Sequence, residues 1–325
     1  FPEYVHQKAL YEDTELVSRI TETERLHQQA WNKVLYKSDA GLHGVTPWYA
    51  EDYDDSDWEK VDMFSDNWAI RNGRPLNGVH WFRKDFFVPE DWSGKEAVLR
   101  LGCIVDADSV FVNGHFVGTV SYQYPPRIYK VPSKLLKKGK NQLTVRLFSY
   151  GGRPSFVKEK PYKLICDGKE VNLEGGWKHK IGTVMPPSPS STAFHYTPVG
   201  LYNGMIYPLR HYTFKGVVWY QGESNVGRWS EYSSLLSALI ADWRTLFKDE
   251  NLPFYIIELA DFLAPDDPGR AAWAELRKQQ AKTARENAHV TLIKNSDTGE
   301  WNDIHPLDKK TAATRLVEAV IQNEK

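Results

Sequence analysis

The sequence predicts an α/β domain in its C-terminal part, with a parallel sheet flanked by helices, and an inserted all-β jelly-roll domain before it. Two patterns predict this. After Leu209, short apolar strands alternate with segments of helical periodicity, which is typical of a parallel sheet covered by helices. Between residues 46 and 160, short alternating strands are separated by Gly, Pro, Asn and Asp, which is typical of a β-sandwich.

The same patterns divide the chain into four segments. Residues 1–45 carry apolar positions at helical spacing, and we assign this helical segment to the α/β domain. Residues 46–160 form the jelly roll. Residues 161–195 are rich in Gly, Pro, Ser and Lys, so we expect a linker that returns the chain from the insert. Residues 196–325 form the second half of the α/β domain.

Individual elements follow from periodicity. In the jelly roll we expect strands at 80–88 and 97–101, and a hairpin over 109–118 that turns on Asn113-Gly114 with type I′ geometry. In the α/β part, apolar runs and helical spacing predict strands and helices in alternation. The strands are 217–219, 254–259 and 290–293, and the helices are 232–247, 271–288 and 309–322.

Composition excludes several classes of function. Lys and Arg number 41 and Asp and Glu 42, so the net charge of −1 indicates neither a nucleic acid nor an anionic membrane as partner. No apolar run approaches the roughly 20 residues that span a bilayer. The two cysteines and the scattered histidines lack the spacing of a metal site, and no Gly-rich phosphate loop occurs. We therefore predict no metal and no cofactor.

The run Trp219-Tyr220-Gln221-Gly222-Glu223-Ser224-Asn225 places two amides, a carboxylate and a hydroxyl on one turn directly after an apolar strand. A plain strand-to-helix connection does not need this density of polar groups. About 80 residues later, Asn302-Asp303-Ile304-His305-Pro306 supplies a histidine, which titrates near neutrality, with carboxylates close by. The two runs together indicate a catalytic site at the carboxyl ends of the strands.

Both runs resemble the sialate O-acetylesterase group of the SGNH-type ester hydrolases, in which W-Y-Q-G-E-S-(N/D) and a late D-(x)-H-P element flank the active site. Residues 198–209 are similar to the family's entry into the second half of its catalytic domain. The hairpin at 109–118 resembles the galactose-binding-like jelly roll that is inserted in this family. The resemblance is close over about residues 195–325, and it implies an SGNH-type fold and a carbohydrate acetylesterase.

The resemblance also implies that a part is missing. The family's nucleophilic serine lies near the N-terminus in a G-(Q/D)-S-N-M element, and these 325 residues contain no such element. We expect that serine on a preceding N-terminal fragment of the same precursor, or on a separate chain. Ser224, the one serine of the run, does not lie in a G-x-S-x-G context and is interpreted as structural.

Roles for the remaining site residues follow from acyl-transfer chemistry. His305 is the predicted general base. Its orienting acid is Asp303 or Glu223, with a slight preference for Asp303. Many relatives place an aspartate three residues before the histidine, where this chain has Asn302, and this departure leaves room for Glu223, which the resemblance to some carbohydrate acetylesterases implies as the acid. Gln221 and Asn225 are the predicted oxyanion and substrate-binding amides. The alternatives are a structural hydrogen bond for Gln221 and a helix cap for Asn225.

We therefore expect a serine ester hydrolase that removes O-acetyl groups from sialic acid or a related acetylated glycan. An acetylxylan-type esterase is the alternative within the same chemistry, and a non-catalytic carbohydrate-binding protein is the alternative outside it. The chain has no N-x-S/T acceptor site, which favours a bacterial source. A periplasmic or secreted location follows as an expectation.

Overall fold

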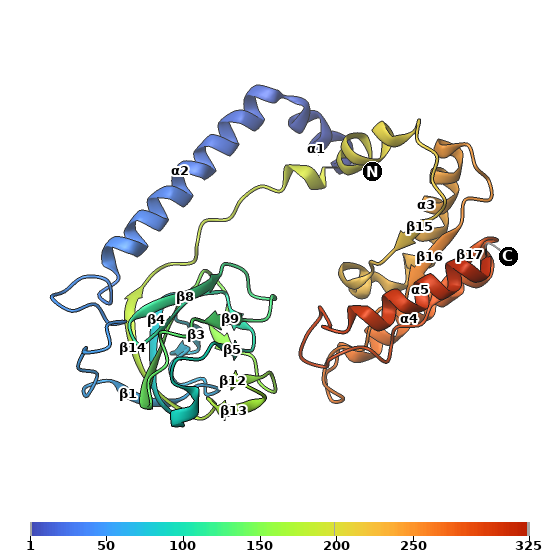
Figure 1. Cartoon of the computed structure of the whole chain (residues 1–325). Coiled ribbons are helices and arrows are strands. Elements are labelled where there is room, and N and C mark those ends of the chain that lie inside the picture. The colour runs from blue at the N-terminus through green and yellow to red at the C-terminus, as the bar shows by residue number, and fades with distance from the viewer. Residues whose placement is uncertain (1, 198, 324–325) are drawn as a thin grey trace. The chain divides into compact units, whose positions relative to one another are not determined.

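The computed structural model describes residues 2–197 and 199–323, which fold into two compact units (Figure 1). One unit, here called the β unit, is Leu10–Thr192. The other, here called the α/β unit, combines Phe1–Ala9 with Ala193–Lys325. Among the described helices, none is both long and apolar enough to cross a membrane.

The N-terminal segment is helical, as the sequence predicts. Helix α1 is Pro2–Glu12 and helix α2 is Thr14–Ser38. The side chain of Asp13 caps α2 by accepting hydrogen bonds from the backbone N–H groups of Glu15 and Leu16. Residues 10–45 differ from their expected assignment, because they belong to the β unit. The reason is the apolar face of α2, which buries Trp31 and Leu35 in a cluster on one face of the larger β-sheet.

The β unit contains two main antiparallel sheets (Figure 1). The larger sheet has six strands, in the order β1 (Glu59–Asp62), β14 (Gly176–Val184), β4 (Gly78–Val88), β10 (Gly139–Ser149), β7 (Ala107–Val112) and β8 (His115–Val120). The smaller sheet has four strands, in the order β13 (Lys169–Asn172), β12 (Tyr162–Cys166), β5 (Ala97–Leu101) and β9 (Ile128–Val131). Short pairs join β2 (Ile70–Arg71) to β3 (Arg74–Pro75) and β6 (Ile104–Val105) to β11 (Ser155–Phe156).

The larger sheet is buried on both faces. Alternate residues of its central strand β4 explain this, because Phe82 and Phe86 face the core shared with the smaller sheet, whereas Val79 and Trp81 face the cluster that contains α2. The predicted hairpin is present between β7 and β8, and both Asn113 and Gly114 have positive φ, as a type I′ turn requires.

Most of the segment 161–195, which we expected to be a linker, forms strands of the β unit. Residues 162–184 contain strands β12, β13 and β14, which complete both sheets of the β unit. The glycines of this segment do not indicate a linker. Gly168 and Gly175 occupy the tight turns between neighbouring strands, where the backbone has positive φ. The lysines instead alternate with buried residues such as Trp177 and His179 along β14.

The β unit also contains both cysteines, which are buried thiols. The Cys103 Sγ–H donates a hydrogen bond to the carbonyl of Tyr124 at 3.3 Å, and Cys166 ends strand β12 with 2% of its surface exposed. Their burial agrees with a packing role rather than with metal binding.

The α/β unit contains the expected parallel sheet. Strands β15 (Val217–Trp219), β16 (Phe254–Ile257) and β17 (Val290–Ile293) pair in that order, and both pairings are parallel. Helices α3 (Tyr232–Phe247), α4 (Arg270–Glu286) and α5 (Lys309–Asn323) follow the three strands in turn. The alternation of strand and helix is therefore confirmed, with element boundaries within two residues of those expected.

Helices cover both faces of this sheet, as the side chains of β16 show. Phe254 and Ile256 pack in one cluster with α3 and α4, whereas Tyr255 and Ile257 pack with α5. All four side chains of β16 are buried, which explains its continuous apolar sequence. The carboxyl ends of three parallel strands consequently lie along one edge of the sheet.

Candidate functional site

The run 219–225 begins at the carboxyl end of β15 and continues into a 3₁₀ segment, η5 (Glu223–Glu231). Gly222 permits the sharp change of direction between them, with a φ of 156°. A Cβ atom at this position would lie 2.7 Å from Cδ2 of Leu276 in α4 and 3.3 Å from Cδ1 of Leu259. Only glycine therefore lets the run approach α4 this closely.

The backbone of Gln221 is held from two sides. Its carbonyl accepts a hydrogen bond from the Tyr232 hydroxyl at 2.8 Å and another from Nε2 of Gln280 at 3.2 Å. Gln280 is fully buried in α4, and its Oε1 accepts the backbone N–H of Leu259 at 2.9 Å. A single glutamine thus ties the loop after β15 to the loop after β16.

The two candidate oxyanion amides contact each other. Nε2 of Gln221 donates to Oδ1 of Asn225 at 2.8 Å, and both side chains are half-buried. Asn225 lies inside η5 and its backbone N–H donates to the carbonyl of Gly222, so it does not cap helix α3, which begins at Tyr232. The amides are held in a fixed pair, and the N–H donors of Asn225 remain for a ligand.

Glu223 is half-buried in the same turn. Its Oε2 accepts the backbone N–H of Gly222 at 3.0 Å, which stabilises the tight turn into η5. The neighbouring Ser224 is exposed. The structure therefore gives Glu223 a local structural contact, and it leaves the carboxylate partly open to solvent.

The loop between β17 and α5 contains Asp303 and His305. Oδ1 of Asp303 accepts the backbone N–H of His305 at 2.8 Å, and only 6% of the surface of Asp303 is exposed. The backbone N–H of Asp303 donates in turn to the carbonyl of Glu300. The aspartate thus shapes the turn that presents the exposed His305 side chain.

One apolar residue connects this loop with the first run. Ile304, between Asp303 and His305, packs against the cluster that also receives Val226 and Trp229 of η5. Packing against a common core fixes the position of both loops at the same edge of the sheet. Both loops follow the carboxyl ends of strands in the same parallel sheet.

Two further polar groups at this edge escaped the sequence interpretation. Oε2 of Glu258, directly after β16, accepts the backbone N–H groups of Asn295 and Ser296, both at 3.1 Å. The Asn295 side chain is buried and donates to the hydroxyl of Tyr220 at 3.2 Å. Glu258 interrupts the apolar run 254–259 directly after the last residue of β16, and a carboxylate at the end of a parallel strand was the signal that could have identified it.

Metal binding has no support at this edge. In the described parts of the chain, no three His, Cys, Asp or Glu side chains are grouped so that they could hold a metal ion. The polar groups of the two loops are amides, one histidine and carboxylates, which suit proton transfer and hydrogen bonding to an oxyanion.

Two family models match parts of the chain. Residues 177–322 match the family model of a carbohydrate esterase described as a sialic acid-specific acetylesterase. This part of the chain is similar to the sialate O-acetylesterase family. Residues 18–177 match a second model, the sugar-binding domain of glycosyl hydrolases family 2. The two matches meet at Trp177, the second residue of strand β14, so the match to the esterase model begins within the β unit.

Curated sialate O-acetylesterases are similar to part of the chain. The sialate O-acetylesterase of Rattus norvegicus is 32% identical over 174 residues, which are 48% of this chain and 30% of the relative. That of Mus musculus is 33% identical over 136 residues, or 36% of this chain and 24% of the relative. The chain thus spans only 24% and 30% of the length of these two relatives. Among solved structures, a carbohydrate acetylesterase from Xanthomonas citri is 20% identical, with 68% of each chain covered and a TM-score of 0.35.

Proposed function

We propose that this chain supplies the base and the oxyanion-binding amides of a serine ester hydrolase, in an SGNH-type arrangement, that removes O-acetyl groups from sialic acid or a related acetylated glycan. The observation that supports it best is that the Gln221–Asn225 pair and the Asp303–His305 turn lie in loops that follow the carboxyl ends of strands in one parallel sheet. The names of the family model and of the curated relatives favour sialic acid over acetylated xylan as the substrate.

The proposed reaction uses two acyl transfers. His305 removes the proton from a serine hydroxyl, and that oxygen attacks the acetyl carbonyl. The amide N–H groups stabilise the negative charge that develops on the carbonyl oxygen. The tetrahedral intermediate collapses, His305 returns the proton to the departing sugar hydroxyl, and the acetyl group stays on the serine. Water, deprotonated by His305, then releases acetate.

Asp303 is the proposed orienting acid and Glu223 the alternative. Asp303 is favoured because it already contacts the histidine's backbone and because its burial makes a fixed charge effective over a short distance. Glu223 contacts its own turn instead. The serine itself is proposed to lie outside these 325 residues, since they contain no G-(Q/D)-S-N-M element. A periplasmic or secreted location remains part of this proposal.

An assay of aryl acetate hydrolysis tests the proposal in two forms of the protein: this chain alone, and this chain together with the segment encoded before Phe1. We expect hydrolysis only in the second form, and we expect His305→Ala to reduce it by roughly 10⁴-fold or more. His211→Ala, which changes an exposed histidine of the same unit, is the matched control and should retain activity.

Two outcomes would contradict the proposal. If the chain alone is active and Ser224→Ala abolishes that activity, the nucleophile lies in this chain. If neither form hydrolyses the ester while the protein still binds glycans, the non-catalytic alternative is correct.

A further inference from the structure

Tyr220 has a hydroxyl proton that the fold does not use. The residue directly follows β15 at the carboxyl edge of the parallel sheet, and 37% of its surface is exposed. Its hydroxyl oxygen accepts hydrogen bonds from Nδ2 of Asn295 at 3.2 Å and from Nζ of Lys309 at 3.4 Å. Both partners are donors, so the Tyr220 O–H must find its own acceptor. None of the residues that the structure describes supplies one, and the proton is available to a ligand.

The buried amide of Asn295 sets this arrangement. The Thr298 hydroxyl donates to Oδ1 of Asn295 at 2.7 Å, so Nδ2 is the atom that meets Tyr220. The backbone N–H of Asn295 donates to Oε2 of Glu258 at 3.1 Å, and the side chain has no exposed surface. A buried polar group with several partners is costly to rearrange. Asn295 therefore holds the phenol in place as a donor.

Lys309 adds a positive charge beside this hydroxyl. It is the first residue of α5, its side chain is exposed, and its Nζ lies 5.0 Å from the centroid of the Tyr220 ring. A cation near the face of an aromatic ring is attracted to it, which keeps the ammonium close to the hydroxyl. An ammonium has three N–H donors, and the contact with Tyr220 uses one. The remaining donors can bind a ligand.

The carboxylates around Lys309 are engaged elsewhere. Asp308 accepts the backbone N–H of Thr311 at 3.0 Å and the hydroxyl of the same residue at 2.7 Å. Asp297 forms an ion pair with Arg315 at 2.6 Å. Over the described parts of the chain, Lys309 forms no ion pair. Its charge is therefore available to an anion from outside the fold.

The Tyr220–Lys309 contact lies between the two candidate catalytic loops. Tyr220 is bonded directly to Gln221, and consecutive Cα atoms are about 3.8 Å apart. Lys309 begins the helix that follows the loop of Asp303 and His305. A ligand group held by Tyr220 and Lys309 therefore lies beside the residues that are proposed to act on the ester.

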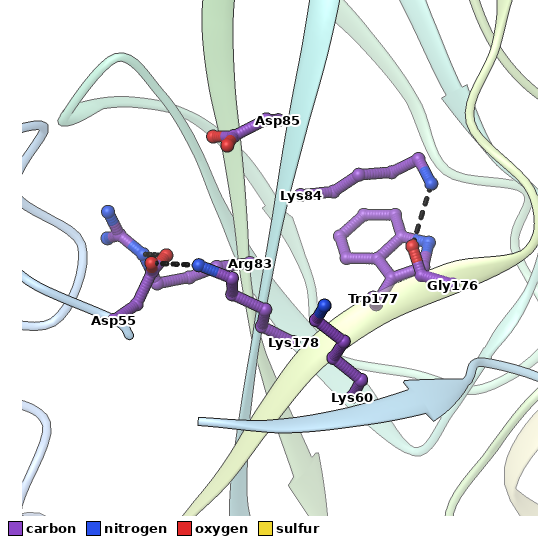
Figure 2. A pocket seen from close by; sticks show the side chains of 8 residues that line it. All are labelled: Asp55, Lys60, Arg83, Lys84, Asp85, Gly176, Trp177 and Lys178. Atoms are coloured by element: carbon purple, nitrogen blue, oxygen red, sulfur yellow. Dashed lines mark hydrogen bonds and ion pairs between the residues drawn. The ribbon is translucent and has the colours of Figure 1, made fainter. Parts of the chain in front are cut away.

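A cavity in the β unit is also lined by cations, but two of them are already paired (Figure 2). Asp55 accepts from Nε of Arg83 at 2.8 Å and also from the Lys178 ammonium. The Trp177 ring beside them is 2% exposed and belongs to the core of the β unit. The Tyr220–Lys309 pair differs, because its donors are not satisfied by a carboxylate of the chain.

We propose that Tyr220 and Lys309 bind the carboxylate of an acidic acetylated sugar and select it over a neutral one. One carboxylate oxygen accepts the phenol O–H and the other accepts an N–H of Lys309, both as charge-assisted hydrogen bonds. A neutral sugar has no charge to pair with this ammonium. The role in substrate selection rests on the proposed function, whereas binding of the carboxylate needs neither His305 nor a nucleophile.

Titration with N-acetylneuraminate tests the site without requiring hydrolysis. Calorimetry or NMR compares the free acid with its neutral methyl ester, using the protein that includes the segment encoded before Phe1. We expect the acid to bind about tenfold more tightly, as one charge-assisted hydrogen bond predicts, and added salt to reduce the difference. Lys309→Gln should remove most of this preference. Tyr220→Phe, which keeps the ring, should reduce it by several fold.

Two lysine variants serve as controls. Lys310→Gln removes the same charge from the adjacent exposed residue, and Lys60→Gln changes the cationic cavity of the β unit. Both should keep the preference for the acid. The proposal is overturned if the acid and its ester bind alike. It is also overturned if Lys309→Gln, folded by thermal melting, has no more effect than either control.

Kinetics distinguishes this inference from the proposed function. In the active enzyme, Lys309→Gln should raise KM for an O-acetylated sialic acid, and lower its kcat/KM about tenfold relative to that for an aryl acetate. If the aryl acetate is hydrolysed and this ratio does not change, the inference is wrong and the esterase proposal stands. If neither ester is hydrolysed while the preference for the acid depends on Lys309, the esterase proposal is wrong and the carboxylate site stands.

Discussion

The side-chain amide of Gln221 donates to the side-chain oxygen of Asn225 at 2.8 Å, so the two candidate oxyanion residues hold each other in place. This contact orients Asn225 by its oxygen and directs its N–H donors away from Gln221. Asn225 thus has two roles: its Oδ1 accepts from Gln221, and its N–H groups are the proposed oxyanion donors. A variant that keeps the oxygen but lacks the N–H groups separates these two roles.

Asn225→Asp is the variant that makes this separation. It retains an oxygen to accept from Gln221 but removes the N–H donors, so we expect the turnover of the active enzyme to fall by roughly 10² to 10³ with little change in Tm. Steady-state kinetics and thermal melting measure the two effects. Asn251→Asp, on an exposed loop of the same unit, controls for the added charge. Unchanged turnover in Asn225→Asp would remove Asn225 from the oxyanion site.

Asp303→Asn and Glu223→Gln distinguish the two candidate acids. An asparagine at 303 can still accept the backbone N–H of His305, so the turn persists while the negative charge is lost. We expect a loss of about 10⁴ in turnover for Asp303→Asn, comparable with the loss when a catalytic histidine adopts the wrong tautomer. The turnover of Glu223→Gln should stay within about tenfold of that of the unaltered enzyme, because the Glu223 side chain stabilises only a local turn. The reverse order of losses would assign the acid to Glu223.

Gly222→Ala tests the close approach of the run to α4. The new Cβ would meet Leu276 at 2.7 Å in a backbone conformation that favours glycine, so we expect a loss of about 1–3 kcal/mol in the free energy of unfolding. Gly227→Ala is the matched control, because nothing lies within 4 Å of its Cβ position. Chemical denaturation measures both. Equal stability of the two variants would contradict the packing described for Gly222.

A buried histidine pair predicts how the stability of the β unit depends on pH. Nδ1 of His80 lies 3.0 Å from Nε2 of His179, and burial lowers the pKa of His80 to about 4 and that of His179 to about 3. The unfolded chain binds protons near pH 6.5, so between pH 6.5 and 4 it binds more protons than the folded chain does. The free energy of unfolding is therefore highest above pH 6.5 and falls as the pH decreases towards 4.

Urea denaturation at pH 7.5, 5.5 and 4.5 measures this dependence. The decrease should reach on the order of a few kcal/mol, since each unit of pKa shift corresponds to about 1.4 kcal/mol. His179→Leu removes one of the two groups and should flatten the curve, whereas His115→Leu, on exposed β8, should not. A curve for His179→Leu that parallels the unaltered protein would show that the pair does not cause the effect.

Local patterns were sufficient for most of the secondary structure. Strand 290–293 and the turn at Asn113-Gly114 were predictable because the apolar period and the need for positive φ depend on the residues themselves. The run 219–225 was also recognisable as a candidate site, because its polar density follows directly after an apolar strand. The segment 161–195 was misread because exposed lysines and turn glycines resemble a linker unless the partner strands are known.

Contacts between distant residues could not be read from the sequence. Gln280 lies 59 positions from Gln221, and nothing in a helix of ordinary composition indicates that its one fully buried glutamine holds that loop. Lys60, Arg83 and Lys178 look like ordinary exposed charges on separate strands until the register places them in one row. Periodicity and turn chemistry act over a few residues, whereas the pairing of strands and the burial of polar groups depend on how the whole chain packs.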